Sequence, residues 1–195
     1  MTDYAELPAR DIERLARNIH AGGWAVENHH PIATLLGSCV AVCLCDTGVP
    51  VGGMNHFMLP KMSRNQHSAE DVMLAGDAAM ENLLNNLLAA GAVRHRIQAK
   101  AFGGGTVIEG KGLGRGIGAQ NVEFAKSWLT RERIPLVSSD FMGPWARKII
   151  LTPQSGEVWC RRMVANLVSE SIRREEEAYA ESLKPQPTRS NVELF

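Results

Sequence analysis

Apolar and polar positions alternate along the chain in blocks that predict both strands and helices. Strand-like apolar runs occupy residues 40–45 and 51–59, and the turn at 46–48 between them predicts a β-hairpin that stops at Pro60. Four further strands are expected, at 97–102, 134–138, 147–152 and 157–163. The last two of these flank a Pro-Gln-Ser-Gly sequence, which favours a second hairpin turn.

The helical spacing of apolar residues occurs in two long segments, 69–90 and 119–131. Ser68 stands where an N-cap of the first helix is expected. A short helix is also expected near the N-terminus, before a loop at Gly22 and Gly23. Helices and strands therefore alternate irregularly along the chain.

These elements predict a single domain of the α/β (α+β) class, with a mixed sheet and hairpins rather than a strict βαβ alternation. The domain is expected over residues 24–165, after an N-terminal extension over 1–23. A charged helix over 166–183 and a flexible tail over 184–195 are expected to follow. The charge run at 173–177 is interpreted as the solvated face of that helix.

The composition is that of an ordinary globular protein, with 45% hydrophobic and 22% charged residues. The formal net charge is zero, which argues against a general nucleic-acid binder. No apolar run approaches the roughly 18 residues that a membrane span needs. Residues 1–20 lack the apolar stretch of a secretory signal, so we expect a cytoplasmic protein that does not insert into membranes.

The four cysteines are expected to be reduced thiols and, by default, small buried hydrophobic residues. A zinc site is a rival interpretation, because Cys39, Cys43 and Cys45 share one face of a strand. Cys39 and Cys45 would stand roughly 20 Å apart on an extended strand, which is too far for one ion. The glycine-rich stretch from Gly105 lacks the Ser or Thr of a nucleotide-binding loop. We therefore expect neither a metal nor a cofactor.

Cys39 and His56 are candidate catalytic residues, because a thiol and an imidazole that lie in contact can act as nucleophile and base. If the hairpin turns at Thr47 and Gly48, opposed residues have numbers that sum to about 95, and the Cβ atoms of Cys39 and His56 then lie roughly 5 Å apart. Gly37 allows a sharp turn before the cysteine, with backbone N–H groups that can stabilise an oxyanion. Spacing alone leaves open that both side chains are ordinary core residues.

Five segments, in order, resemble the chemoreceptor glutamine deamidases of the CheD family. They are residues 34–43 around Cys39, 52–60 around His56, 76–80, 99–104 and 117–122. The resemblance extends from residue 24 to residue 163. It implies a layered α/β sandwich with an active site related to that of bacterial toxin deamidases.

The resemblance also implies an activity, the hydrolysis of particular glutamine side chains on methyl-accepting chemotaxis receptors to glutamate, with release of ammonia. Cys39 matches the nucleophile of the family and His56 matches its base, and the reaction would pass through a thioester. A CheC-like chemotaxis phosphatase is a further partner that the resemblance suggests.

One position departs from the family pattern. The third catalytic residue of the family is a threonine six positions before the cysteine, where this chain has Ala33. Thr34 takes that role if the backbone is shifted by one residue; otherwise Cys39 and His56 act as a dyad. The departure favours an alternative, a non-catalytic module that keeps the fold and docks on receptors or on a phosphatase.

Overall fold

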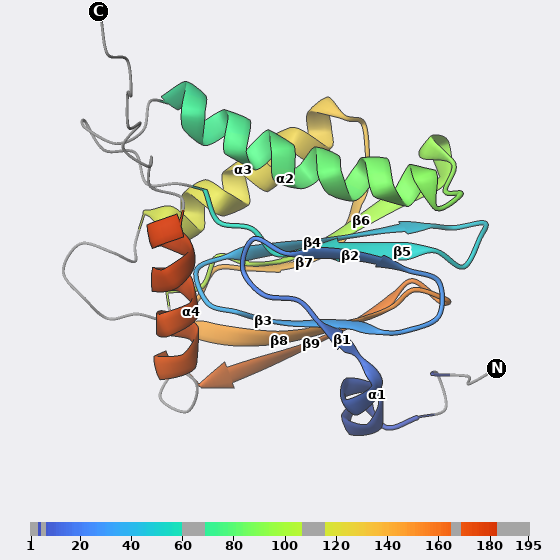
Figure 1. Cartoon of the computed structure of the whole chain (residues 1–195), viewed down its shortest axis with the longest axis horizontal. Coiled ribbons are helices and arrows are strands. Elements are labelled where there is room, and N and C mark those ends of the chain that lie inside the picture. Colours follow the sequence, from blue (N-terminus) through green and yellow to red (C-terminus); the bar gives the residue numbers. More distant parts are fainter. Residues whose placement is uncertain (1–3, 5–6, 60–68, 107–115, 165–168, 183–195) are drawn as a thin grey trace, which may run out of the picture.

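Two β-sheets packed face to face form the centre of the molecule in the computed structural model (Figure 1). The structure describes residues 4, 7–59, 69–106, 116–164 and 169–182. The first sheet contains, in spatial order, β1 (Arg17–Asn18), β3 (Ile32–Leu36), β8 (Trp145–Thr152) and β9 (Glu157–Val164). The second contains β2 (Trp24–Glu27), β5 (Gly52–Asn55), β4 (Val40–Asp46), β6 (Ile97–Gly103) and β7 (Leu136–Phe141).

Helices α2 (Ala69–Ala89) and α3 (Ile117–Arg131) cover the outer face of the second sheet, so helices and sheets form three layers (Figure 1). Met80, Leu83 and Leu87 recur on the buried side of α2, at the spacing that places them on one helix face. A short 3₁₀ helix, η2 (Arg94–Arg96), leads from α2 into β6. Most strand pairs are antiparallel, but β1–β3 and β6–β7 are parallel. The predicted α+β class with a mixed sheet is therefore confirmed.

Most of the expected elements are present, with shifted ends. The two long helices, the charged C-terminal helix α4 (Ser169–Ser182) and the strands β6, β8 and β9 lie where they were predicted. The strand expected at 134–138 begins later, as β7, and the sequence pattern did not predict β1, β2 or β3. The proposed cap Ser68 and the tail at 184–195 lie outside the described residues.

The first hairpin, β4–β5, is also confirmed, but its register differs from the prediction. β4 and β5 pair Cys43 with Met54, so opposed residue numbers sum to 97 rather than 95. The cause is a loop longer than a two-residue turn, in which Asp46 N donates to Val51 O at 3.2 Å. Gly48 N also donates to the Asp46 carboxylate at 2.6 Å, which shapes the loop.

Two helices lie at the periphery of the sheets. α1 (Ala9–Leu15) packs through Ile12 against Ala33 and Ile150 of the first sheet. Figure 1 shows α4 lying across the ends of both sheets, near the point where β3 leads into β4. None of the helices described is both long and apolar enough to span a bilayer.

Candidate active site

The turn that carries Cys39 connects the two sheets. It runs from Gly37 to Cys39, between β3 in the first sheet and β4 in the second. Gly105 N donates to Gly37 O and Gly104 N donates to Cys39 O, both at 2.8 Å. Gly103, at φ +123°, approaches so closely that an added Cβ would collide with the carbonyl oxygen of Cys39. The three glycines therefore fix the backbone of the candidate nucleophile.

Asn121, on the buried face of α3, holds the same turn from another side. Its Nδ2 donates to Ser38 O at 3.0 Å, and its Oδ1 accepts from Leu59 N at 2.8 Å. One fully buried amide therefore ties the segment of Cys39 to the segment of His56. The role of Asn121 was not predicted from the sequence, although a polar side chain among the apolar ones of a helix face is a signal for such a buried contact.

His56 follows the last residue of β5 and reaches from the second sheet to the first. His56 N donates to Gly23 O at 2.9 Å, and Gly22 N donates to His56 O at 2.8 Å. The ring atom Nδ1 lies 2.8 Å from Oγ1 of Thr34 on β3. Thr34 donates its single hydroxyl hydrogen to Ile19 O at 2.8 Å, so its oxygen accepts from Nδ1–H. This assigns the tautomer that leaves the lone pair on Nε2.

Nε2 of His56 is thus the ring atom available for proton transfer. It is buried and has no hydrogen-bond partner among the described residues. Burial lowers the pKa of His56 to about 3, with a smaller contribution from His20, so the ring is neutral near pH 7. A neutral imidazole with an unshared electron pair is the form that a general base requires.

Thr34, rather than Ala33, faces His56. Ala33 packs with Ile12 and Ile150 in a separate apolar cluster. Successive side chains of a strand point to opposite faces, so only one of these two neighbours can reach the ring. The structure therefore places a threonine hydroxyl on the imidazole, although the spacing to the cysteine departs from the family pattern.

Cys39 and His56 lie on adjoining chain segments, without a hydrogen bond between their side chains. Val40 and Phe57, the residues that follow them, form a pair with two backbone hydrogen bonds of 2.9 Å. Cys39 and His56 are therefore diagonal neighbours, and such pairs stand about 7–8 Å apart in a regular ladder. The predicted direct opposition was wrong, because the hairpin loop shifts the register by two residues.

The Cys39 thiol is covered in this structure. The residue has no exposed surface, and burial is the main cause of a pKa well above the usual range of a thiol. The charge and hydrogen bonding of the Glu176 carboxylate, carried by α4, raise this pKa further. Glu176 is only 6% exposed, so the predicted solvated face at 173–177 is wrong at this position, whereas Arg173 and Arg174 are exposed as expected.

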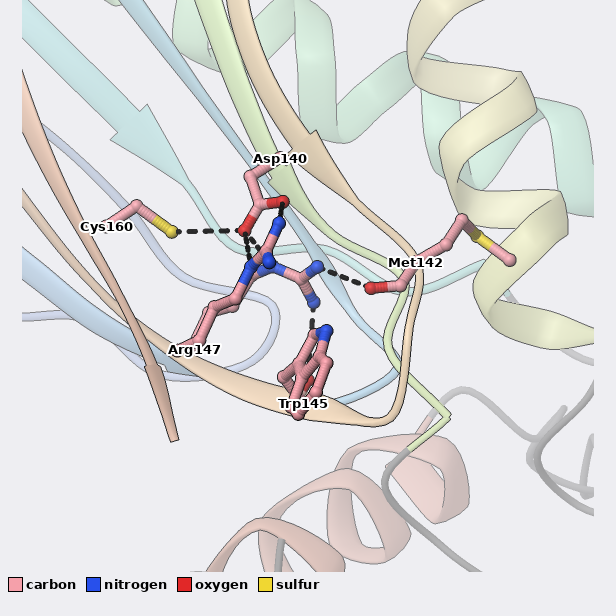
Figure 2. Close-up of polar contacts among 6 residues, drawn as sticks. Asp140, Met142, Trp145, Arg147 and Cys160 are labelled. Atoms are coloured by element: carbon pink, nitrogen blue, oxygen red, sulfur yellow. Dashed lines mark hydrogen bonds and ion pairs between the residues drawn. The ribbon is translucent and has the colours of Figure 1, made fainter. Parts of the chain in front are cut away.

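Figure 2 shows a charged corner between β7 and β8, where Arg147 and the Cys160 thiol point toward the Asp140 carboxylate. Asp140 accepts a hydrogen bond of 3.0 Å from Nε of Arg147, and bonds of 2.9 and 2.6 Å from Nε and Nη2 of Arg162. The buried Arg147 also donates to the carbonyl oxygen of Met142, whose N–H in turn donates to Gly103 O at 2.9 Å. The corner therefore supports the glycines that hold the turn of Cys39.

Among the other three cysteines, Cys160 belongs to this corner, because its thiol donates to the Asp140 carboxylate at 3.6 Å. Cys43 is buried in β4, and burial raises its pKa. Burial also raises the pKa of Cys45 and of Cys160 to about 11. Within the ranges that the structure describes, no three His, Cys, Asp or Glu side chains gather as a metal-binding group.

Comparison with known proteins identifies the family of the chain. The family model for CheD chemotactic sensory transduction matches residues 58–162. A "Probable chemoreceptor glutamine deamidase CheD 2" of Dechloromonas aromatica (strain RCB) is 55% identical, and the alignment covers 99% of this chain and 100% of the relative. Its namesake in Burkholderia thailandensis is 38% identical, over 95% of this chain and 96% of the relative.

The two relatives extend the similarity beyond the family model, which begins after Cys39 and His56. A further relative, the "Probable chemoreceptor glutamine deamidase CheD" of Saccharophagus degradans, is 35% identical over 88% of this chain and 80% of its own length. Both the family model and these near full-length alignments agree with the resemblance seen in the sequence. The chain belongs to the CheD family.

Proposed function

We propose that the protein is a glutamine deamidase that converts glutamine side chains of methyl-accepting chemotaxis receptors to glutamate and releases ammonia. The names of its relatives support this activity. The observation that carries the proposal is that Thr34 orients His56 so that Nε2 stays unpaired next to the segment of Cys39. The same proposal places the protein in the cytoplasm.

In the proposed reaction, Sγ of Cys39 attacks the amide carbon while Nε2 of His56 accepts the thiol proton. The backbone N–H groups of Ser38 and Cys39 stabilise the oxyanion that forms on the amide oxygen. His56 then protonates the leaving nitrogen, ammonia departs and a thioester remains. A water molecule deprotonated by His56 hydrolyses the thioester, which releases the glutamate side chain and restores the thiol.

Thr34 acts in this proposal as a positioning residue, because it fixes the tautomer of His56 without touching the substrate. Thr34→Val removes the acceptor for Nδ1–H, and we expect kcat to fall about tenfold or more with a small change in KM. Thr34→Ser keeps the hydroxyl and should retain most of the activity. Equal kinetics of the two variants on receptor fragments would argue against this role.

The central test compares two buried cysteines. Purified protein is incubated with cytoplasmic receptor fragments, ammonia is measured, and mass spectrometry locates each glutamine that becomes glutamate. We expect Cys39→Ala to abolish both signals and Cys43→Ala to leave them largely intact, with His56→Ala nearly as severe as Cys39→Ala. Similar activity of the two cysteine variants would refute the assignment of the nucleophile.

A non-catalytic module that binds receptors or a CheC-like phosphatase is the second candidate. The observation that favours it is the covered, protonated thiol of Cys39. Such a module would bind receptor fragments without releasing ammonia, and its binding would be unchanged by Cys39→Ala. Ammonia release that depends on Cys39 excludes it.

A further inference from the structure

Helix α4 closes the site that the proposed reaction needs open. Cys39 has no exposed surface and His56 is 2% exposed, so a glutamine carried by another protein cannot reach them in this arrangement. Figure 1 shows α4 across the ends of the sheets. Ile172, Glu176 and Tyr179, at helical spacing, form the face of α4 that packs against the domain.

The carboxylate of Glu176 lies in the turn of the candidate nucleophile. Its Oε1 accepts from Ser38 N at 2.6 Å and from Cys39 N at 3.2 Å, and its Oε2 accepts from Ser38 Oγ at 2.7 Å. Gly37 leaves room for this contact, because an added Cβ would lie 2.6 Å from both Glu176 Oε1 and Ile172 Cγ2. The helix therefore approaches the turn as closely as a glycine allows.

These contacts are the ones that a bound reaction product would make. A glutamate side chain is what remains after a glutamine loses ammonia, and one oxygen of Glu176 accepts from the same two N–H groups that would stabilise the oxyanion. We propose, provided that the deamidase function holds, that α4 is a built-in product analogue: Glu176 fills the side-chain subsite and inhibits the enzyme until a glutamine-bearing helix replaces α4.

The way in which Glu176 is held allows a substrate glutamine to displace it. The arginines of α4 pair along the helix, Arg173 with Glu177 and Arg174 with Glu170. Within the described part of the chain, Glu176 has no cationic partner and is held by N–H and O–H donors. The amide oxygen of a glutamine can accept from the same donors, so a substrate side chain competes directly with Glu176.

The first experiment turns the analogue into a substrate. In Glu176→Gln, the introduced amide lies beside Sγ of Cys39, and amide plus water should give carboxylate plus ammonia through the thioester. We expect peptide mass spectrometry of the purified full-length variant to find glutamate at position 176. The introduced glutamine should persist when Cys39→Ala is added, and in the matched control Glu177→Gln, which lies on the exposed side of the same helix.

The second experiment removes the Glu176 carboxylate from the turn of Cys39. Glu176→Ala should increase the rate at which iodoacetamide alkylates Cys39 about tenfold, because the charge-assisted hydrogen bonds that hold α4 over the thiol are lost. The rate of receptor-fragment deamidation should rise in parallel. Glu177→Ala, the matched control on the exposed side, should change neither rate.

The outcomes separate this inference from the proposed function. If the wild-type protein deamidates receptor fragments but the glutamine of Glu176→Gln persists, the product-analogue proposal is overturned. The proposed deamidase function is then retained. Unchanged alkylation and deamidation in Glu176→Ala overturn it in the same way. If the wild-type protein and Glu176→Ala both release no ammonia, the deamidase function fails, and the product-analogue proposal fails with it.

Discussion

Two carboxylates, the half-buried Asp140 and the buried Glu176, are held by opposite kinds of partner. Asp140, in the corner between β7 and β8, lies between the guanidinium groups of Arg147 and Arg162. Glu176, on α4, accepts from backbone N–H groups and from the hydroxyl of Ser38, and it also interacts with the Cys39 thiol. Asp140 is neutralised by cations that the sheets carry. Glu176 is held by neutral donors, in a site to which α4 brings it.

The difference indicates which contact is permanent. If Asp140 left its corner, the buried Arg147 would lose its counter-ion, which is costly. If Glu176 leaves its subsite, the donors that it releases can bind water or a substrate amide instead. We therefore expect the corner to contribute to the stability of the whole domain and the contact of α4 to contribute to regulation of the site.

The largest expected effect is on the corner. Asp140→Ala leaves the guanidinium of Arg147 buried and unpaired, and should lower the free energy of unfolding by about 3–5 kcal/mol in urea titrations. Arg162→Ala is the control. That side chain is solvent-exposed, so its removal should lower the free energy of unfolding much less than Asp140→Ala does. A stability of Asp140→Ala close to that of the wild type would break the distinction between the two carboxylates.

The second effect comes from pH. The pKa of His56 is about 3 in the folded protein, below the ordinary value near 6.5, so between these values the unfolded chain binds a proton that the folded chain does not. Stability should therefore fall by about 2 kcal/mol from about pH 7 to about pH 5. The two arginines keep the pKa of Asp140 well below its usual range, so the corner does not titrate in this window.

The control for the pH effect is His56→Gln, which removes the titrating ring. Its unfolding free energy, measured by urea titration at each pH, should fall less steeply over the same window. A slope identical to that of the wild type would show that the acid sensitivity comes from another group.

A smaller effect is expected at the contact of α4. Glu176→Ala should cost about 1 kcal/mol or less in global unfolding, because its loss frees only α4 from the domain. Amide hydrogen exchange should accelerate in α4 and in the turn at Ser38, and remain unchanged in β8. A global loss as large as that of Asp140→Ala would mean that α4 is part of the core rather than a displaceable cover.

The smallest effect is expected for Cys160→Ala. The thiol donates to the Asp140 carboxylate at 3.6 Å, but two guanidinium groups already satisfy that carboxylate. Stability should change by less than about 0.5 kcal/mol. A loss of more than about 2 kcal/mol would show that the corner depends on the thiol as well as on its ion pairs.

The sequence predicted the elements whose signals are local. The hairpin of β4 and β5 and the helices α2 and α3 follow from periodicity and turn residues within each segment. β3 was missed, because almost all of its residues are buried and it lacks a clear polar alternation. The hairpin register was missed because Asp46 shapes the loop partly through Arg96, which is distant in sequence.

The sequence by itself determined the family and the two residues that carry the proposed chemistry, Cys39 and His56, because both stand in recognisable contiguous segments. Only the tertiary structure decided that Thr34 rather than Ala33 meets His56, and that Glu176 enters the turn of Cys39. The physical reason is that these contacts join segments far apart in the chain. Which face of a strand or helix becomes buried depends on what packs against it, and a local pattern does not encode that partner.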